Sequence, residues 1–283
     1  MVGYNYCRWD YKEETMEFKI ALCQIGGSMD KEIAKQNAEK HVREAAENGA
    51  QVISLPEMWD CPYSNDYFRE YAEPADGPTV EFMSKLAADL GVYLIGGSIS
   101  ELDGDKVYNT SFCFNRQGDL IGRHRKVHLF DIDVKGGIRF MESDTLTAGE
   151  DMTILDTEFC KIGVAICYDV RFPEWFRRMA LEGAKVIVLP GAFNMTTGPA
   201  HWDMTMRARA LDNQVYFAAN APARDENGVY VAYGNSCIAS PWGDFIAHCD
   251  EKEQILYGDI DLDRVDAVRE QLPLLKHRRP QLY

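Results

Sequence analysis

The sequence has no apolar run long enough to cross a lipid bilayer. Its longest apolar runs, Val92 to Ile99 and Ala184 to Pro190, fall well short of the roughly 20 residues that a membrane-spanning helix needs. The start of the chain also lacks the basic segment and apolar stretch of a signal peptide, because Met1 to Glu17 is polar and aromatic. These absences argue against a membrane-bound enzyme and predict a cytoplasmic protein.

Positive charge is scarce as well. Thirty Lys and Arg residues stand against 45 Asp and Glu residues, which gives a formal net charge of −15. Nucleic acids and anionic membranes bind basic surfaces, because cationic side chains release the counterions of the phosphates. The charge therefore argues against both as partners and favours small substrates or protein partners.

Cysteine is present, but its spacing gives no zinc or redox motif. None of the eight cysteines forms a C-x-x-C pair, so the sequence predicts free thiols in a reducing compartment. His124 and His128 have the four-residue spacing of helical metal ligands, but no third ligand or acidic helper lies near them in the sequence. We therefore predict no metal site.

Short β-like runs alternate with amphipathic helical stretches from Phe18 to Ile260, without a Pro/Ser-rich linker or low-complexity segment. This alternation is typical of an α/β fold. It predicts a single domain over residues 17–283, preceded by an extension over residues 1–16 to which we assign no function. The tail over residues 272–283, rich in proline and basic residues, is expected to be helical only in part and to be a candidate subunit contact.

Two helices can be predicted in detail. The first has Asp30 as its N-cap and ends at Gly49, and the second ends at Gly91. Their apolar faces are predicted to consist of Ile33, Ala34, Ala38, Val42 and Ala45 in the first helix, and of Val80, Met83, Leu86 and Leu90 in the second. Each helix leads directly into a strand-like run, at residues 51–55 and 92–99.

Residues 49–56 and 183–190 repeat one another in letters as well as in type. Each segment has a Gly that ends a helix, then a buried strand, then a Pro that stops the strand ladder. The repeat predicts two halves of one architecture, and with the β-rich middle it predicts two sheets covered by helices. Ligands in open α/β sheets bind at the carboxyl ends of strands, which is where the residues after Pro56 and Pro190 lie.

The middle of the chain is richer in β character. Tyr108, Thr110, Phe112 and Phe114 alternate as in a strand with two different faces. Residues 235–248 contain two strand-like runs around a turn at Pro241–Asp244, which predicts a hairpin.

Glu57 lies at the end of an apolar strand and is followed by Met58 and Trp59. A carboxylate desolvated by such neighbours has its pKa raised toward the range of a general base. An exposed loop glutamate is the alternative interpretation. Lys126, the last residue of the basic run Arg123–Lys126, is likewise either part of a solvated face or a lysine directed inward.

Cys167 lies between the strand-like run Lys161–Ile166 and a helix whose first turn contains Pro173. Backbone N–H groups and a positive helix end would stabilise a thiolate there, and also the oxyanion that a thiolate creates. Taken alone, a cysteine at a strand end is more often an inert core residue.

Three segments together decide between these interpretations. Leu55–Glu57, Arg125–Phe130 and Cys167–Glu174 resemble the three catalytic motifs of the nitrilase superfamily, in the right order and at compatible spacing. The resemblance covers the chain from about Phe18 to Tyr283. It implies a four-layer αββα sandwich with two pseudo-repeated halves, a homodimer formed through helical faces, and catalysis without a metal or organic cofactor.

The resemblance also implies roles for individual residues. Glu57 is expected to be the general base and Cys167 the nucleophile. Lys126 and the backbone N–H of Tyr168 are expected to hold the oxyanion. Glu142 resembles the second glutamate of the family, which orients the lysine or the substrate amide; a loop carboxylate is the alternative.

Within the superfamily, segments 129–133, 191–202 and 207–216 resemble the omega-amidases of the Nit2 type. That branch hydrolyses dicarboxylic acid monoamides such as 2-oxoglutaramate and succinamate to the dicarboxylate and ammonia. The planar guanidinium of Arg171 can donate two hydrogen bonds to the substrate carboxylate at the end away from the amide. A surface salt bridge with Glu174 is the alternative. The other expected substrate-binding residues are Phe130, Phe193, Thr196 and Thr197.

Other functions stay open at this point. Another amidase of the superfamily, such as a deaminated glutathione amidase or an N-carbamoyl hydrolase, would share the catalytic residues and differ in the pocket. A true nitrilase would act on a nitrile instead of an amide. From a different class, a non-catalytic scaffold on the same fold is the remaining alternative.

Overall fold

The computed structural model describes residues 16–135 and 139–282, so nearly all of the predicted N-terminal extension lies outside it. One layer is a seven-stranded sheet in which β1, β2 and β3 run parallel and the other pairs run antiparallel. In spatial order its strands are β15 (Gln254–Asp261), β1 (Glu17–Gln24), β2 (Val52–Ser54), β3 (Tyr93–Ile95), β5 (Lys106–Phe114) and β4 (Ile99–Asp103), with β6 (Leu120–Arg125) also paired to β5. Strands from the two ends of the described chain thus belong to one sheet.

The second layer is a six-stranded sheet with three parallel strands, β10, β11 and β12, at its centre. Its spatial order is β14 (Phe245–His248), β13 (Cys237–Ala239), β12 (Tyr216–Asn220), β11 (Ala184–Pro190), β10 (Lys161–Val164) and β9 (Thr153–Asp156). A small separate pair joins β7 (Asp131–Asp133) to β8 (Arg139–Met141).

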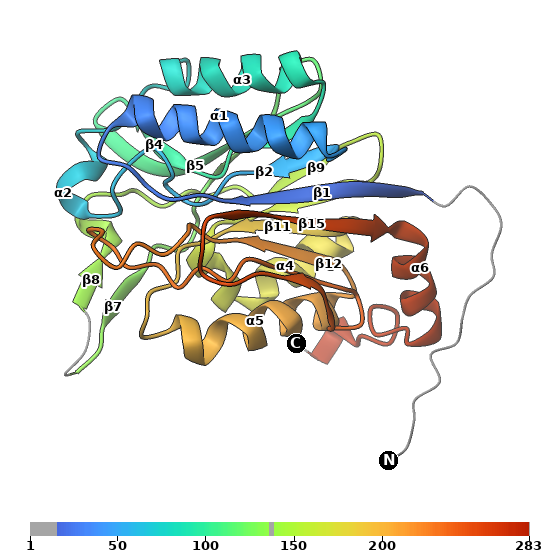
Figure 1. Cartoon of the computed structure of the whole chain (residues 1–283). Helices are drawn as coiled ribbons and strands as arrows, with labels where there is room; N and C mark the ends of the chain where they lie inside the picture. Colours follow the sequence, from blue (N-terminus) through green and yellow to red (C-terminus); the bar gives the residue numbers. More distant parts are fainter. Residues whose placement is uncertain (1–15, 136–138, 283) are drawn as a thin grey trace.

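Helices cover the outer faces of both sheets (Figure 1). The first sheet carries α1 (Lys31–Glu47) and α3 (Pro78–Leu90), and the second carries α4 (Pro173–Leu181) and α5 (Gly198–Asn213). The shorter elements are α2 (Asn65–Phe68), α6 (Leu262–Gln271) and the 3₁₀ turns η1 (Glu142–Asp144), η2 (Cys167–Arg171) and η3 (Pro280–Leu282). The predicted four-layer αββα sandwich is confirmed.

Three buried apolar clusters hold the four layers together. One fills the space between α1, α3 and the first sheet, and a second fills the space between α4, α5 and the second sheet. The third lies between the two sheets and includes Ile20, Val52, Val164, Val188 and Ala218. Because both faces of each sheet are covered, the central strands are apolar on both sides.

The predicted strand in the middle of the chain is confirmed as β5. The alternation in Tyr108–Phe114 indicated two different faces, and both faces are covered, because every residue from Val107 to Phe114 is buried. Phe112 packs toward the helices, whereas Cys113 packs toward the second sheet. An alternation of aromatic and polar residues therefore marks two kinds of core here and not a core and a solvent face.

The first helix begins as predicted and differs on its apolar face. The Asp30 carboxylate caps α1 by accepting hydrogen bonds from the backbone N–H groups of Glu32 and Ile33. Ile33, however, is 56% exposed, while the buried face is built on Ala34, Ala38, His41, Val42 and Ala45. The expectation for Ile33 was wrong because its neighbour Ala34 occupies the position that points to the sheet.

The second helix and the segment after it were predicted with mixed success. Val80, Met83 and Leu86 are buried in α3 and Leu90 packs against them, with Gly91 as the C-cap. The expected strand over residues 92–99 is interrupted, because β3 ends at Ile95 and β4 starts only at Ile99. A bend at Gly96 and Gly97 separates the two strands.

The predicted repeat corresponds to equivalent places in the two sheets. β2 and β11 each follow a helix, and each lies between two parallel neighbours. The predicted hairpin is confirmed as well, because β13 and β14 pair antiparallel around the turn at residues 240–244. Within the described residues no helix is long and apolar enough to span a membrane.

Gly97 supports the segment that carries Glu57 and gives a test of this packing. Its φ is +62°, and an added Cβ would overlap the carbonyl oxygen of Pro56 and lie 2.7 Å from that of Leu55. Gly104 has nearly the same φ, +63°, but no heavy atom within 4 Å of such a Cβ. We expect Gly97→Ala to lower the free energy of unfolding by about 3 kcal/mol or more and Gly104→Ala by about 1 kcal/mol. Urea unfolding of both variants measures the difference, and equal losses would contradict this account.

Candidate active site

Three residues of the predicted motifs come from different elements. Glu57 follows β2 of the first sheet, Lys126 follows β6, and Cys167 follows β10 of the second sheet at the start of η2. Pro56 directly precedes the glutamate, and the backbone of Gly191, just after β11, lies against Cys167. The carboxyl ends of strands from both sheets therefore meet at one place, as the repeat predicted.

Lys126 is directed inward and is 1% exposed, which excludes a solvated basic face. Its Nζ donates hydrogen bonds to Glu57 Oε1 at 3.0 Å and to Glu142 Oε1 at 2.8 Å. Burial by itself would lower its pKa, but the carboxylates of Glu142 and Glu57 raise the pKa of Lys126 well above the ordinary value. The ammonium thus stays charged throughout the neutral pH range.

Glu57 is 2% exposed and is held from both halves of the fold. Its Oε1 accepts hydrogen bonds from Lys126 Nζ and, at 2.9 Å, from Asn109 Nδ2 on β5. Its Oε2 accepts one from the backbone N–H of Ala192, after β11, at 2.7 Å. A carboxylate with this many donors has a fixed orientation, so the interpretation as an exposed loop glutamate was wrong.

Glu142 is fully buried at the start of η1. Its Oε1 accepts from Lys126 Nζ, and its Oε2 accepts from the backbone N–H of Phe130 at 2.7 Å. Of the roles considered for this residue, orientation of Lys126 is the one with a direct contact. The alternative of a free loop carboxylate was wrong.

Cys167 adopts a φ of +45°, which is unfavourable for a residue with a Cβ. Gly191 permits this turn, since even a Cβ on Gly191 would lie 3.2 Å from the Cα of Cys167. Strained backbone of this kind is concentrated at functional sites. The turn is continued by η2, where the N–H of Tyr168 belongs to the helix start and has no carbonyl partner within the helix.

The thiol itself is protonated in the resting site. Burial first, and then the negative charge of Glu57, raise the pKa of Cys167 well above its ordinary value, although Lys126 acts in the opposite direction. Stabilisation of a thiolate by the strand–helix junction stays a prediction, and it concerns the state that forms once the proton has left. A base must remove the proton, and Glu57 is the hydrogen-bond partner of the thiol.

Asp169 fixes the turn around Cys167 and connects it to the lysine segment. Its carboxylate accepts from the backbone N–H of Ile166 at 2.9 Å and of His128 at 2.9 Å, and contacts His128 Nδ1 at 2.7 Å and His124 Nε2 at 3.1 Å. Burial alone would raise the pKa of Asp169, but these hydrogen bonds hold it well below its usual range. The two histidines therefore serve this carboxylate, and no group of metal-binding side chains occurs among the described residues.

The residues predicted to bind substrate are only partly brought together. The Arg171 guanidinium lies 4.7 Å above the Phe193 ring, and Phe193 also packs edge-on against Trp202. Thr197 instead donates its hydroxyl to Asn194 Oδ1, while Thr196 is exposed. Phe130 is buried against Tyr168 with ring centroids 5.1 Å apart.

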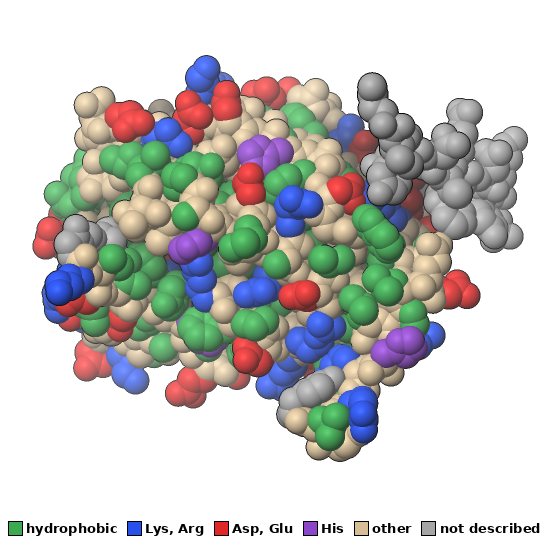
Figure 2. Space-filling view, turned by 90° about the horizontal axis from the view of Figure 1, so that it is seen from below, with side chains coloured by type: hydrophobic (Ala, Val, Ile, Leu, Met, Phe, Trp, Pro, Cys, Tyr) green, Lys and Arg blue, Asp and Glu red, His purple; other side chains and the backbone are tan. Residues whose placement is uncertain are grey.

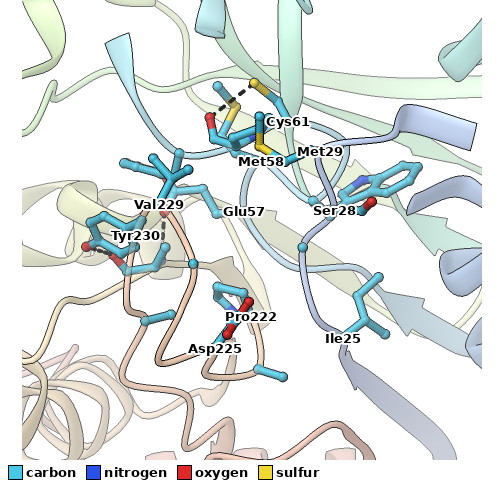
Figure 3. Close-up of a pocket in the computed structure, with 18 of the residues that line it drawn as sticks. Ile25, Ser28, Met29, Glu57, Met58, Cys61, Pro222, Asp225, Val229 and Tyr230 are labelled. Carbon is cyan, nitrogen blue, oxygen red and sulfur yellow. Dashed lines mark hydrogen bonds between the residues drawn. The ribbon is translucent and has the colours of Figure 1, made fainter. Parts of the chain in front are cut away.

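A cavity of about 230 Å³ reaches the site from the side of Glu57 (Figure 3). Val229 and Tyr230 from the loop before β13 lie on one side of it, and Ile25 and Ser28 lie on the other. Cys167, Lys126 and the predicted substrate-binding residues do not line it. Of the four predicted catalytic residues, Glu57 is thus the one that lines this cavity, together with its neighbour Tyr63.

Tyr63 and Asn109 belong to the site and were missed at the sequence level. Tyr63 is buried, and its hydroxyl contacts Glu57 and Glu142, whereas Asn109 contacts Glu57. Tyr63 follows Cys61 and Pro62 only a few residues after Glu57, which is the one local hint. Asn109 could not be distinguished from the other residues of its β-rich run.

A buried thiol beside a carboxylate and an ammonium is the arrangement found in enzymes that use a cysteine nucleophile for acyl transfer. The carbon–nitrogen hydrolase family matches residues 19–270 of the chain. The chain belongs to this family.

Named relatives and solved structures agree with that assignment. The chain is 50% identical to "Omega-amidase NIT2-A" of Xenopus laevis over 94% of its length and 97% of that protein, and 46% identical to "Omega-amidase NIT2" of Homo sapiens over 94% and 96%. The crystal structure of Saccharomyces cerevisiae Nit3, a member of branch 10 of the nitrilase superfamily, covers 93% of this chain and 97% of its own with 42% identity and a TM-score of 0.86.

Proposed function

We propose that this protein is an omega-amidase, which hydrolyses the amide of small dicarboxylic acid monoamides such as succinamate and 2-oxoglutaramate to the dicarboxylate and ammonia. Two kinds of observation support the proposal. The similarity to omega-amidases extends over nearly the whole chain. The buried cluster of Glu57, Lys126, Glu142 and Cys167 contains a base, an oxyanion donor and a nucleophile.

In the first half-reaction the thiol of Cys167 attacks the amide carbon while Glu57 takes its proton. The negative charge that develops on the amide oxygen is held by the Lys126 ammonium and the N–H of Tyr168, each worth about 3 kcal/mol in the transition state. Protonated Glu57 returns the proton to the amide nitrogen as the carbon–nitrogen bond breaks. Ammonia leaves, and the acyl group remains on sulfur as a thioester.

In the second half-reaction Glu57 removes a proton from water. The hydroxide equivalent adds to the thioester carbon, the carbon–sulfur bond breaks, and sulfur regains the proton from Glu57. One carboxylate therefore serves both half-reactions. The cavity beside Glu57 offers water a path to this carboxylate.

The observation that supports this substrate class is that the Arg171 guanidinium is half-buried and has no carboxylate partner among the described residues. Arg171 lies four residues after Cys167, and among the described residues no carboxylate lies within ion-pair distance of it, Glu174 included. Burial lowers the pKa of its guanidinium, which is the cost of leaving a cation partly desolvated. A substrate carboxylate would remove that cost through a bidentate pair.

Removal of the Arg171 cation should lower kcat/KM for substrates that carry a carboxylate much more than for substrates that lack one. For Arg171→Met we expect kcat/KM to fall about 100-fold with succinamate, as for a lost hydrogen-bonded ion pair, and less than about 3-fold with butyramide. Ammonia release measures both. Arg43→Met, a change on the exposed side of α1, serves as the matched control. An equal loss with both amides would contradict the assignment of Arg171.

The same assay separates the alternative functions. An N-carbamoyl hydrolase or a deaminated glutathione amidase would leave succinamate untouched and release ammonia or an amine from carbamoyl or peptide-like amides. A non-catalytic scaffold would act on none of them, and its cysteine would react with iodoacetamide no faster than the others. A cytoplasmic location stays a prediction from the sequence.

We propose further that the protein forms a homodimer through its α4 and α5 face. Met204 and Leu211 on α5 and Leu181 at the end of α4 are exposed, as is Trp242 in the neighbouring turn, where Gly243 accepts a hydrogen bond from Arg207. Hydrophobic side chains are spread over the side of the molecule seen from below (Figure 2). Light scattering should give twice the mass of one chain, and Met204→Glu should reduce it to that of one chain. A monomeric wild type would contradict the proposal.

A further inference from the structure

We propose that Tyr63 is a positioning residue of the active site, whose hydroxyl holds Glu57 in place in both of its protonation states and joins it to Glu142. The proposal goes beyond the function proposed above, and rests on it only for the role of Glu57 as the base. Nothing in the three catalytic motifs includes a tyrosine at this place.

The Tyr63 hydroxyl contacts three charged groups at once. It lies 2.5 Å from Glu142 Oε1, 3.2 Å from Glu57 Oε1 and 3.4 Å from Lys126 Nζ. A phenol hydroxyl has a single hydrogen to donate and oxygen lone pairs that accept. Glu57 Oε1 and Glu142 Oε1 both accept from that one hydrogen while the two carboxylates are ionised, and the oxygen lone pairs stay free to accept from a donor.

The charge balance explains why this site needs a neutral donor. Glu57 and Glu142 are two buried carboxylates beside one buried ammonium, so one negative charge is uncompensated. Burial, and then the negative charges of Glu142 and Glu57, raise the pKa of Tyr63 well above its ordinary value. The hydroxyl therefore keeps its hydrogen while the two carboxylates are ionised, and stabilises them.

The same contact suits the protonated state of the base. When Glu57 takes the proton of Cys167, its new O–H can donate to the Tyr63 oxygen while Tyr63 continues to donate to Glu142. The carboxyl group then keeps its orientation between the first and second half-reactions. Asn109 Nδ2 cannot do this, because an amide nitrogen only donates.

The ring of Tyr63 is fixed by aromatic neighbours independently of its hydroxyl. It packs against Tyr230 with ring centroids 4.8 Å apart, edge-on against Phe68 at 5.5 Å, and against Phe140 at 5.9 Å. Tyr63→Phe keeps these contacts and removes the hydroxyl alone. Tyr67→Phe is the matched control, because the Tyr67 ring packs on Tyr71 and its hydroxyl makes no hydrogen bond within the described residues.

The test compares pH profiles of the two variants and the wild type by two methods. One is the rate of alkylation of Cys167 by iodoacetamide, and the other is ammonia release from succinamate. The groups that face Glu57 and Tyr63 are Lys126, Glu142, Cys167 and Tyr230, and all of them remain in Tyr63→Phe. Any movement of the profile therefore reports the lost hydroxyl.

For Tyr63→Phe we expect kcat to fall about 10- to 100-fold, as for the loss of a hydrogen bond to a charged group, with KM changed less than about 3-fold. The acidic limb of both profiles should move to higher pH, because a carboxylate that has lost a donor holds its proton more tightly. Tyr67→Phe should match the wild type. A residue that only supported the fold would lower the melting temperature and leave the acidic limb in place.

An acidic limb unchanged in Tyr63→Phe would overturn the proposal. If the variant does not fold, fluorotyrosine introduced at position 63 gives the answer, because its more acidic hydroxyl is a stronger donor and should move the limb to lower pH; an unchanged limb would again overturn it. The alkylation profile needs no substrate. A wild type inactive on succinamate would thus sink the omega-amidase function while leaving the inference about Tyr63 to be decided by alkylation.

Discussion

Replacement of Cys167 by alanine is expected to lower kcat for ammonia release from succinamate by about 10⁴-fold or more. The thiol is the group that forms the covalent bond, and the donors that remain, Lys126 and the N–H of Tyr168, can only stabilise an oxyanion that nothing creates. The side chain is 4% exposed, so the truncation leaves the surface of the molecule unchanged.

Two controls make the result specific. Cys160→Ala, in the turn before β10, should retain the activity of the wild type, because this half-buried thiol faces Lys185 and none of the catalytic groups. Mass spectrometry of wild type quenched during turnover should show an acyl group on Cys167. If Cys167→Ala keeps more than about 1% of the activity, the thioester mechanism is wrong.

Lys126→Gln is expected to remove both activity and stability. It leaves Glu57 and Glu142 buried without their counter-ion, which we expect to lower the free energy of unfolding by about 3 to 5 kcal/mol at pH 8. In the wild type the folded pKa of Lys126 is raised, so its contribution is fully present below the ordinary lysine pKa and is lost only as the pH rises through the higher folded value.

The variant should show the opposite pH dependence. Without the ammonium, burial raises the carboxylate pKa values in the folded state, so the stability deficit should shrink as the pH falls toward 5. Adding Glu142→Gln to Lys126→Gln should recover more than about half of the lost stability and none of the activity, because it removes the excess charge but not the need for an oxyanion donor. Urea unfolding at pH 5 and pH 8 gives these values. A Lys126→Gln protein as stable as the wild type at pH 8 would contradict the ion-pair account.

Much of the fold could be read from local patterns. Neighbouring residues determine where a helix begins and ends, because capping and backbone conformation act within a few positions. This is why the sequence predicted the N-cap at Asp30, the helix end at Gly91 and the repeated helix–strand segments at 49–56 and 183–190. The errors came from contacts with distant elements. The prediction for Ile33 was wrong because the face of α1 that becomes buried depends on how this helix packs on the first sheet.

The chemistry of the site was also largely present in the sequence. Glu57, Lys126 and Cys167 lie in short motifs at strand ends, and the resemblance of these motifs to the nitrilase superfamily implied a base, an oxyanion donor and a nucleophile. Neither the protonated state of the thiol nor the contact of Glu142 with Lys126 followed from the order of residues, since both depend on burial and on charges from other elements.

The sequence by itself thus determined the α/β class and the place of Glu57, Lys126 and Cys167 in motifs at strand ends, because each of these depends on residues close together in the chain. Only the tertiary structure decided how the reactive groups are held. Tyr63 is 79 positions from Glu142, and Asn109 is 52 positions from Glu57. Such contacts arise where β2, β5, β6 and β10 meet, and a buried hydrogen bond between distant residues leaves no pattern along the chain.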